Sequence, residues 1–240
     1  MKKLLLATAL MALTAGFASA DVVRLATEGA YPPFNFIDDK GEVAGFEREF
    51  GDEVCKRAAL ECTWTTNEWD SIIPNLQSGN YDVIIAGMSI TDERSKVITF
   101  SENYYPPAAS AYLAASADAD VKTGIVSAQV GTIQAAYVAE SGATLLEFPT
   151  PDETVAAVRN GEAAAVFADK DYLRPFAAES NGALVFAGED IAIGGGVGLG
   201  MRQSDTELKG KMDTAIKAMK ADGSLNVLIE KYFGPEGLKF

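Results

Sequence analysis

The sequence predicts an α/β protein of two lobes, with mainly parallel sheets flanked by helices and a two-strand hinge between the lobes. Strands alternate with helices along the chain, which is typical of βαβ units. One pattern occurs twice: a helix, a turn at Ser78–Gly79 or Asn160–Gly161, and a short apolar strand that leads to Ala86–Gly87 or Ala168–Asp169. Two similar lobes follow from this repetition.

Two segments connect the predicted lobes. Tyr104–Pro107 and the extended Ala108–Ala114 lead out, and Gly194–Gly200 leads back. Proline on one crossing and glycine on the other suit a hinge, although a wandering loop or a closely packed strand would also explain the glycines. We expect the first lobe to comprise 21–108 and 195–240, and the second lobe 109–194.

Apolar periodicity assigns most elements in order. In the first lobe we expect strand Val22–Thr27, an extended loop Tyr31–Phe36, helix Phe46–Ala59, strand Cys62–Thr66, helix Trp69–Leu76, strand Tyr81–Ala86 and a helix after Thr91. In the second lobe we expect strand Ile125–Val130, helix Gln134–Ser141, strand Thr144–Phe148, helix Asp152–Asn160 and strand Ala163–Ala168. Ligands bind beyond the carboxyl ends of parallel strands, so we expect the site there.

The first twenty residues have the pattern of a secretory signal peptide. Lys2 and Lys3 precede the apolar run Leu4–Phe17, and Ala18–Ala20 forms a small-residue cleavage site. We expect the mature protein to begin near Asp21 and to be soluble outside the cytoplasm; the resemblance given below places it in the periplasm.

The remaining chain is expected to be acidic and to have no direct membrane anchor. The full sequence carries 34 acidic and 20 basic residues, and removing the signal takes away two lysines and no acid. Such a chain repels nucleic acid and anionic membrane surfaces. No later segment has about 18 uninterrupted apolar residues. The first cysteine, Cys55, lies far from the cleavage point, which argues against a lipid anchor.

Cys55 and Cys62 are the two cysteines of the chain. In an oxidising compartment, a pair at this spacing predicts a local disulfide between a helix and the following strand. A metal pair is the alternative, but the sequence has no histidine and no second cysteine pair. We therefore expect neither a metal nor a cofactor.

The stretch Tyr81–Arg94 carries the first candidate binding residues. Its strand ends in small and hydroxylated residues, among them Ser89, and Thr91 is placed to cap a short helix. Arg94 then falls at the third helical position, which is unfavourable for the helix dipole. A ligand carboxylate would explain it, because a guanidinium binds carboxylates through two hydrogen bonds. The alternative is a surface ion pair with Asp92, Glu93 or another acid.

Several kinds of catalytic site are excluded. Without histidine a Ser-His-Asp triad is impossible, and neither G-x-G-x-x-G nor G-x-x-x-x-G-K-[ST] occurs. Carboxylates, an arginine, hydroxyls and aromatic side chains remain for a site.

Four segments now give a specific resemblance: TEGAYPPFNF (Thr27–Phe36), GFEREFGDEVCKRA (Gly45–Ala58), WDSIIPNLQSGNYDVIIAGMSITDER (Trp69–Arg94) and FSENYY (Phe100–Tyr105). Together they resemble periplasmic substrate-binding proteins of polar amino acid ABC transporters, especially the lysine/arginine/ornithine, histidine and opine group. The likeness covers Val22–Phe233, including the cysteine pair. It implies a type II periplasmic binding protein fold, a bilobal clamp without catalysis, a membrane permease as partner, and a monomer.

The resemblance also implies roles for single residues. Arg94 matches the arginine that grips the ligand α-carboxylate, with help from the Ser89 hydroxyl and the backbone at Gly87 and Thr132. Asp169 matches the acceptor of the α-ammonium group.

Tyr31 and Trp69 resemble the aromatic walls along the ligand side chain, and Glu28 resembles the acid at its far end. Arg94 and Asp169 balance an amino acid zwitterion, so Glu28 is a surplus negative charge that predicts a ligand with a cationic side chain. The aromatic walls would add cation–π attraction.

Each assignment has an alternative based on structure alone. Glu28 could face solvent, and Asp169 could cap the helix that starts at Lys170. Tyr31 and Trp69 could be ordinary core aromatics.

The sequence departs from the group at several positions. Glu28 stands where Asp is usual, Ala86–Gly87 where a serine pair is common and Ile133 where threonine is frequent, and the linker after Ala114 is shorter. These changes leave lysine, arginine, ornithine, histidine and opines open as ligands. Two other functions compete with transport: an enzyme similar to periplasmic cyclohexadienyl dehydratases, and a receptor sensor module, which the lack of a membrane span or kinase-like segment disfavours.

Overall fold

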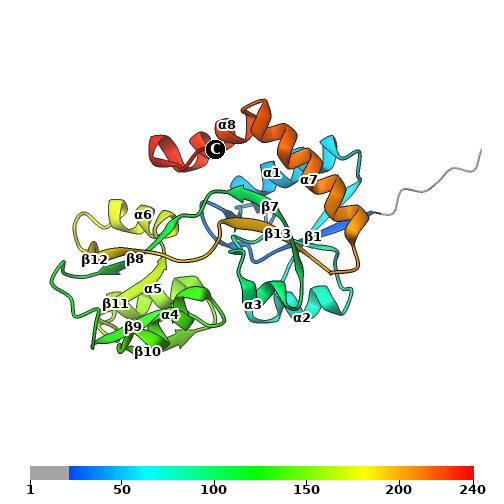
Figure 1. The fold of residues 1–240 in the computed structure, drawn as a ribbon. Coiled ribbons are helices and arrows are strands. Elements are labelled where there is room, and N and C mark those ends of the chain that lie inside the picture. The colour runs from blue at the N-terminus through cyan, green and yellow to red at the C-terminus, as the bar shows by residue number, and fades with distance from the viewer. Residues whose placement is uncertain (1–21) are drawn as a thin grey trace, which may run out of the picture.

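The computed structural model of the protein describes residues 22–240, which form two lobes joined by two crossing segments (Figure 1). The expected signal peptide, 1–20, and Asp21 lie outside the described residues. Within 22–240, no helix combines the length and the apolar character that crossing a membrane requires.

The first lobe is built on a five-stranded sheet of order β5-β1-β6-β13-β7. Its strands are β1 (Val23–Thr27), β5 (Cys62–Thr66), β6 (Val83–Ile84), β7 (Thr99–Tyr105) and β13 (Val197–Met201). Its helices are α1 (Phe46–Arg57), the 3₁₀ turn η1 (Trp69–Ser71), α2 (Ile72–Gln77), α3 (Asp92–Ser95), α7 (Thr206–Ala221), α8 (Ser224–Phe233) and the 3₁₀ turn η2 (Gly234–Glu236).

Both faces of this sheet are covered, because its strands carry apolar side chains on both sides. Leu25 of β1 packs in a core with residues of α1, α7 and α8. Ala26, the next residue, packs on the other face with Ile72 and Leu76 of α2. Figure 1 shows α1, α7 and α8 above the sheet and α2 and α3 below it.

The second lobe repeats this architecture with the strand order β10-β9-β11-β8-β12. The strands are β8 (Ala109–Ala114), β9 (Ile125–Gln129), β10 (Thr144–Phe148), β11 (Ala165–Asp169) and β12 (Val185–Ala192). Helix α4 (Ile133–Ser141) covers one face, and α5 (Pro151–Arg159) and α6 (Lys170–Glu179) cover the other.

The sheets are mixed, so the expectation of mainly parallel sheets holds for only part of each. β1 is parallel to β5 and β6, and β9 is parallel to β10 and β11. In contrast, β13 is antiparallel to β6 and β7, and β8 is antiparallel to β11 and β12. The antiparallel strands β13 and β8 each enter their sheet from the other lobe and not through a helical crossover within the sheet, so the parallel arrangement of βαβ units does not extend to them.

The two crossing segments form the expected two-strand hinge. The chain leaves the first sheet between β7 and β8 and returns between β12 and β13 (Figure 1). The boundaries that we propose for the lobes, 108/109 and 194/195, fall in these two connections. Part of the glycine run belongs to strand β13. This strand is closely packed, because a Cβ atom at Gly198 would lie 2.9 Å from Ile90 Cδ1.

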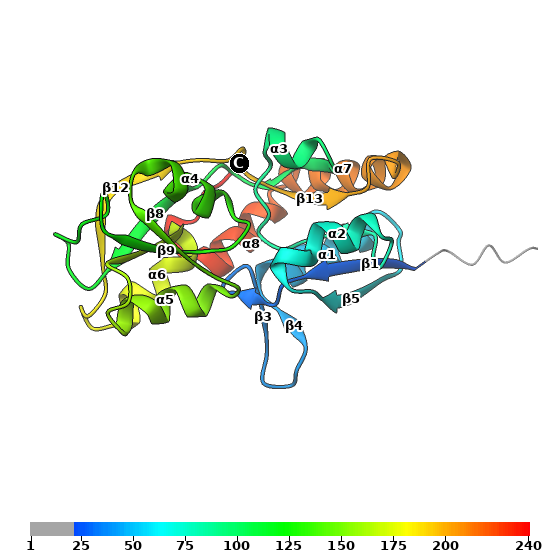
Figure 2. The ribbon, with the colours of Figure 1, turned by 90° about the horizontal axis from the view of Figure 1, so that it is seen from below.

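Several local expectations are corrected by the structure. The loop Tyr31–Phe36 contributes to a small sheet of β2 (Ala30–Tyr31), β3 (Asn35–Ile37) and β4 (Val43–Ala44), and the loop between β3 and β4 projects from the first lobe (Figure 2). The helix expected at Trp69–Leu76 is a 3₁₀ turn followed by α2. Pro74 lies in the first turn of α2, where its missing N–H group is not needed.

Candidate ligand-binding site

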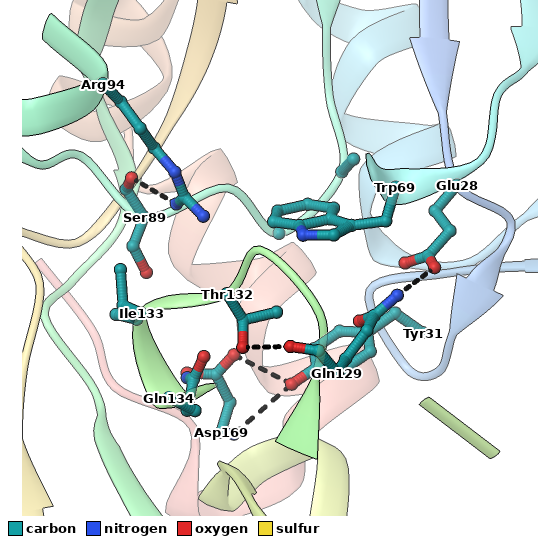
Figure 3. A pocket seen from close by; sticks show the side chains of 12 residues that line it. Glu28, Tyr31, Trp69, Ser89, Arg94, Gln129, Thr132, Ile133, Gln134 and Asp169 are labelled. Carbon is teal, nitrogen blue, oxygen red and sulfur yellow. Dashed lines mark hydrogen bonds between the residues drawn. The ribbon is translucent and has the colours of Figure 1, made fainter. Parts of the chain in front are cut away.

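A pocket lies between the lobes, at the carboxyl ends of several strands. All of the residues predicted for the site line it: Glu28, Tyr31, Trp69, Gly87, Ser89, Arg94, Thr132 and Asp169. Ala86, Gln129, Ile133 and Gln134 complete the lining. Figure 3 shows Arg94 and Glu28 on opposite sides of the pocket, with Trp69 between them.

Arg94 is held by backbone groups and an aromatic ring. Thr91 caps α3 as expected, since its hydroxyl accepts from the Arg94 N–H at 3.1 Å. The guanidinium donates to the Ser89 carbonyl at 2.9 Å and to the Gly131 carbonyl at 3.4 Å. Its carbon lies 5.2 Å from the centre of the Trp69 ring.

The alternative that Arg94 only pairs with a neighbouring acid is wrong. None of the ion pairs among residues 22–240 includes Arg94, and Glu93 pairs with Lys96 instead. Burial lowers the pKa of Arg94 to about 10, although the negative charge of Asp169 opposes this shift. Arg94 is half-buried, and a guanidinium in such a position without an ion pair is suited to binding an anion.

Asp169 ends β11 and faces the pocket. Its carboxylate accepts from the Tyr31 hydroxyl at 2.9 Å and from the Gln134 amide at 3.0 Å. Asp169 occupies the N-cap position of α6, but its side chain makes no capping hydrogen bond, so capping does not account for the carboxylate. Burial raises the pKa of Asp169 to about 6, and the charge of Asp171 adds to the shift, while Tyr31, Arg94 and Gln134 oppose it.

Glu28 follows β1 and is held from the other lobe. The Gln129 amide donates to it at 2.5 Å, and no ion pair of the described residues includes Glu28. Burial raises the pKa of Glu28 to about 7, and neighbouring acids add to the shift, while the hydrogen bond from Gln129 opposes it. A nearby ligand cation would favour the ionised form.

The two aromatic side chains serve both the core and the pocket. The Tyr31 ring stacks on Tyr172 of the second lobe, with 4.1 Å between ring centres, and its hydroxyl reaches Asp169. Trp69 is only 9% exposed and belongs to a core cluster of the first lobe. The alternative of core aromatics is therefore partly right, and both residues line the pocket as well.

The expected backbone contribution of Gly87 needs a correction. Its N–H group donates to the buried Glu47 at 2.6 Å, so this donor is already used. The backbone N–H of Thr132, the other expected donor, donates to the Gln129 carbonyl at 3.4 Å, and the Thr132 hydroxyl caps α4 by accepting from the Ala135 N–H at 3.1 Å. The first turn of α4 still presents backbone N–H groups toward the pocket end of the helix.

Gln129 and Gln134 are pocket residues that sequence reasoning missed. Gln129 is the last residue of β9, and Gln134 lies in the first turn of α4. Both amides hold a carboxylate of the pocket, Glu28 and Asp169 respectively. The position of Gln129 at a strand end was a usable signal, because the same rule identified Asp169.

The predicted disulfide is present and lies away from the pocket. Cys55 of α1 is bonded to Cys62 of β5, and neither residue lines the pocket. It connects the end of a helix to the start of the next strand of the first lobe.

The arrangement fits a small ligand with charges of both signs. One guanidinium and two carboxylates converge on one pocket, and aromatic rings lie between them (Figure 3). Because these groups are half-buried, water screens them less than at an exposed surface, so they act more strongly on a ligand.

Comparison with known proteins agrees with this geometry. ABC transporter arginine-binding protein 1 of Escherichia coli strain K12 is 31% identical over 244 residues, which are 97% of this chain and 99% of that protein. A crystal structure of a periplasmic His/Glu/Gln/Arg/opine family-binding protein from Silicibacter pomeroyi, in complex with lysine, has 66% identity and a TM-score of 0.90. That match covers 91% of this chain and 100% of that one.

A more distant structural neighbour bears on the enzyme alternative. It is an ancestral amino acid-binding protein described as a precursor of cyclohexadienyl dehydratase, with 28% identity and a TM-score of 0.79 over 88% of this chain and 95% of that one.

The family model described as bacterial extracellular solute-binding proteins, family 3, matches residues 23–235. The fold is the type II periplasmic binding protein fold of these relatives. The chain therefore belongs to the family 3 bacterial extracellular solute-binding proteins.

Proposed function

We propose that this protein captures an amino acid or opine with a cationic side chain in the periplasm and delivers it to the permease of an ABC transporter. In this proposal the signal peptide is cleaved, the mature protein acts as a monomer, and it performs no catalysis.

The observation that carries the proposal is the imbalance of charge in the pocket. Arg94 can bind an α-carboxylate and Asp169 an α-ammonium group, which together match the amino acid zwitterion. Glu28 is then a half-buried carboxylate that no ion pair among residues 22–240 includes. A cationic side chain that extends past Trp69 and Tyr31 would compensate this charge, and the aromatic rings would favour it.

The relatives support a ligand of this class. One is named as an arginine-binding protein, and another was crystallised with lysine. Those names describe the relatives, and the choice among lysine, arginine, ornithine, histidine and opines stays open for this chain.

Contacts across the pocket suggest how binding and closure are coupled. Tyr31 to Asp169, Gln129 to Glu28 and Arg94 to the Gly131 carbonyl each join one lobe to the other. In our proposal the ligand first docks on the lobe of Arg94. Closure about the hinge then brings Thr132 and Asp169 over it, so that the ligand shifts the balance toward the closed form.

Calorimetry with the mature protein, freed of bound ligand by unfolding and refolding, tests the proposal. Lysine, arginine, ornithine, histidine, octopine and nopaline are titrated, with glutamine as the uncharged control. We expect at least one cationic ligand to bind at least about tenfold more tightly than glutamine, because a charged hydrogen bond contributes about 1.5–3 kcal/mol.

Two variants test the assignment of the charges. Glu28→Gln should weaken cationic ligands selectively and leave the affinity for glutamine nearly unchanged. Arg94→Ala should weaken every amino acid by about 1.5–3 kcal/mol or more. Unchanged binding by Arg94→Ala would show that the site is wrong.

The pKa of Glu28, at about 7, also favours one rival function. A carboxylic acid with this pKa can act as a general acid near neutral pH. Incubation of the protein with prephenate, followed by product analysis, separates the two functions. Turnover that is lost in Glu28→Gln would support an enzyme, and the absence of product together with tight amino acid binding would support transport.

A further inference from the structure

Glu47 is a buried carboxylate directly beneath the pocket. It is 0% exposed, and it does not line the pocket. No ion pair of the described residues includes it, so its burial has no compensating cation within residues 22–240. A buried carboxylate of this kind costs stability unless hydrogen bonds compensate it.

Three donors converge on this carboxylate. The N–H of Gly87 donates at 2.6 Å, the Asn35 amide donates at 2.7 Å, and the Tyr104 hydroxyl donates as well. Asn35 in turn accepts from the N–H of Gly29 at 2.7 Å through its side-chain oxygen. The chain of hydrogen bonds therefore runs from Gly87 through Glu47 and Asn35 to Gly29.

The two ends of this chain are the two first-lobe loops of the pocket. Gly29 follows Glu28, and Gly87 begins the stretch that contains Ser89 and leads to Arg94. Both glycines have positive φ, 76° and 60°, and neither has a side chain that could anchor its loop. Their N–H groups are the points at which the protein holds them.

Helix α1 gives Glu47 a fixed position. Gly45 precedes the helix and Glu47 is its second residue, where the helix dipole favours a negative charge. The N–H groups of Phe46 and Glu47 donate to the carbonyls of Pro33 and Phe34, which ties the start of α1 to the segment next to Asn35.

We propose that Glu47 is a positioning residue for ligand binding, which holds the Glu28 loop and the Gly87–Arg94 loop at a fixed separation from beneath the pocket. Glu47 thereby sets the distance between Glu28, which meets the ligand side chain, and Arg94, which binds the ligand α-carboxylate. This inference rests on the proposed function. The Gly87 N–H, the Asn35 amide and the Tyr104 hydroxyl all donate to the side chain of Glu47. This position therefore calls for a side chain with acceptors and no donor, which explains why a carboxylate stands there.

An exchange of the amide and the carboxylate tests the network. In Glu47→Gln the NH₂ group of the new amide must face another donor, either the Asn35 amide or the Gly87 N–H, so one hydrogen bond is lost. In Asn35→Asp two carboxyl groups stand side by side, and the donor from residue 35 to Glu47 is lost. The double variant Asn35→Asp/Glu47→Gln reverses the pair, so that every hydrogen bond from Gly87 to Gly29 again joins one donor to one acceptor. It also keeps the net charge of the wild type.

We expect each single variant to bind lysine and arginine at least about tenfold more weakly in calorimetry, because a buried polar group left unpaired costs about 1–3 kcal/mol. The double variant should recover to within about threefold of the wild type. Ser101→Ala is the matched control, since it removes a buried hydrogen bond to the Leu199 N–H, 2.9 Å, outside the pocket. It should lower thermal stability and leave both affinities unchanged.

Amide hydrogen exchange of the ligand-free protein tests the same network without a ligand. The N–H groups of Gly29 and Gly87 should be protected in the wild type, exchange at least about tenfold faster in a single variant, and be protected again in the double variant. Rapid exchange of both N–H groups in the wild type would overturn the inference. In calorimetry, a folded Glu47→Gln variant with wild-type affinity would also overturn it, as would a double variant that binds no more tightly than the single variants. If the wild type binds no cationic amino acid and no opine, the proposed function fails while the exchange experiment still decides the role of Glu47.

Discussion

The carboxylate of Glu28 receives a hydrogen bond from Gln129 at 2.5 Å and lies in an acidic neighbourhood. Its pKa is about 7 in the folded protein, against an ordinary value of 4.5. Because burial disfavours the charged form, the contribution of Glu28 to stability is largest below about pH 4.5. It is lost progressively as the pH rises from 4.5 to 7.

This shift predicts that Glu28→Gln stabilises the ligand-free protein at high pH. Urea unfolding should show little change at pH 5 and an increase on the order of 2–3 kcal/mol at pH 8, since one pKa unit corresponds to about 1.4 kcal/mol. Glu207→Gln, a change at a fully exposed acid, should have little effect at either pH. A Glu28→Gln protein that is no more stable than the wild type at pH 8 would contradict the assigned burial.

At the scale of residues, charge was the property that the sequence revealed best. Arg94 stood out because Thr91 fixed its place in a short helix, where a cation has no structural benefit. Gln129 and Gln134 carry no charge and resemble any polar residue in the sequence, although they hold both pocket carboxylates. Glu47 was hidden for another reason: an acid in the first turn of a helix is usually solvated, and only the fold shows its burial.

Among the elements, helix α1 and strand β5 are joined by the disulfide between Cys55 and Cys62. We predict that the double variant Cys55→Ala/Cys62→Ala has a free energy of unfolding lower by about 2–3 kcal/mol, as expected for a short loop. The affinity for lysine should stay the same, because the bond is remote from the pocket. Urea unfolding and calorimetry measure the two quantities, and reduced wild type is the control for the variant.

Elements were predictable where apolar periodicity and turn residues coincided. The strands Cys62–Thr66 and Thr144–Phe148 have their expected bounds. Helices α7 and α8 were left unassigned, although Met212, Ala215, Ile216 and Met219 follow the helical spacing. The pairing of β2 with β3 has no comparable signal, because strands of two or three residues are too short to show a period.

For the whole molecule, the closure that we propose about the hinge predicts a change in overall size. Adding saturating lysine to the wild type should reduce the radius of gyration measured by small-angle X-ray scattering, because the ligand favours contacts between the lobes. Arg94→Ala at the same lysine concentration should keep the ligand-free value. An unchanged radius in wild type that calorimetry shows to be saturated would contradict a closing clamp.

The connectivity of the two sheets also orders the events of folding. All strands of the second sheet lie in one continuous segment, Ala109–Ala192, whereas β13, which follows that segment, occupies a place between β6 and β7 in the first sheet. The first sheet therefore stays incomplete until residues near Met201 are available to fold. The second lobe can fold earlier as an autonomous unit, and the contacts that complete the first lobe span about half the chain, which makes its assembly the slower step.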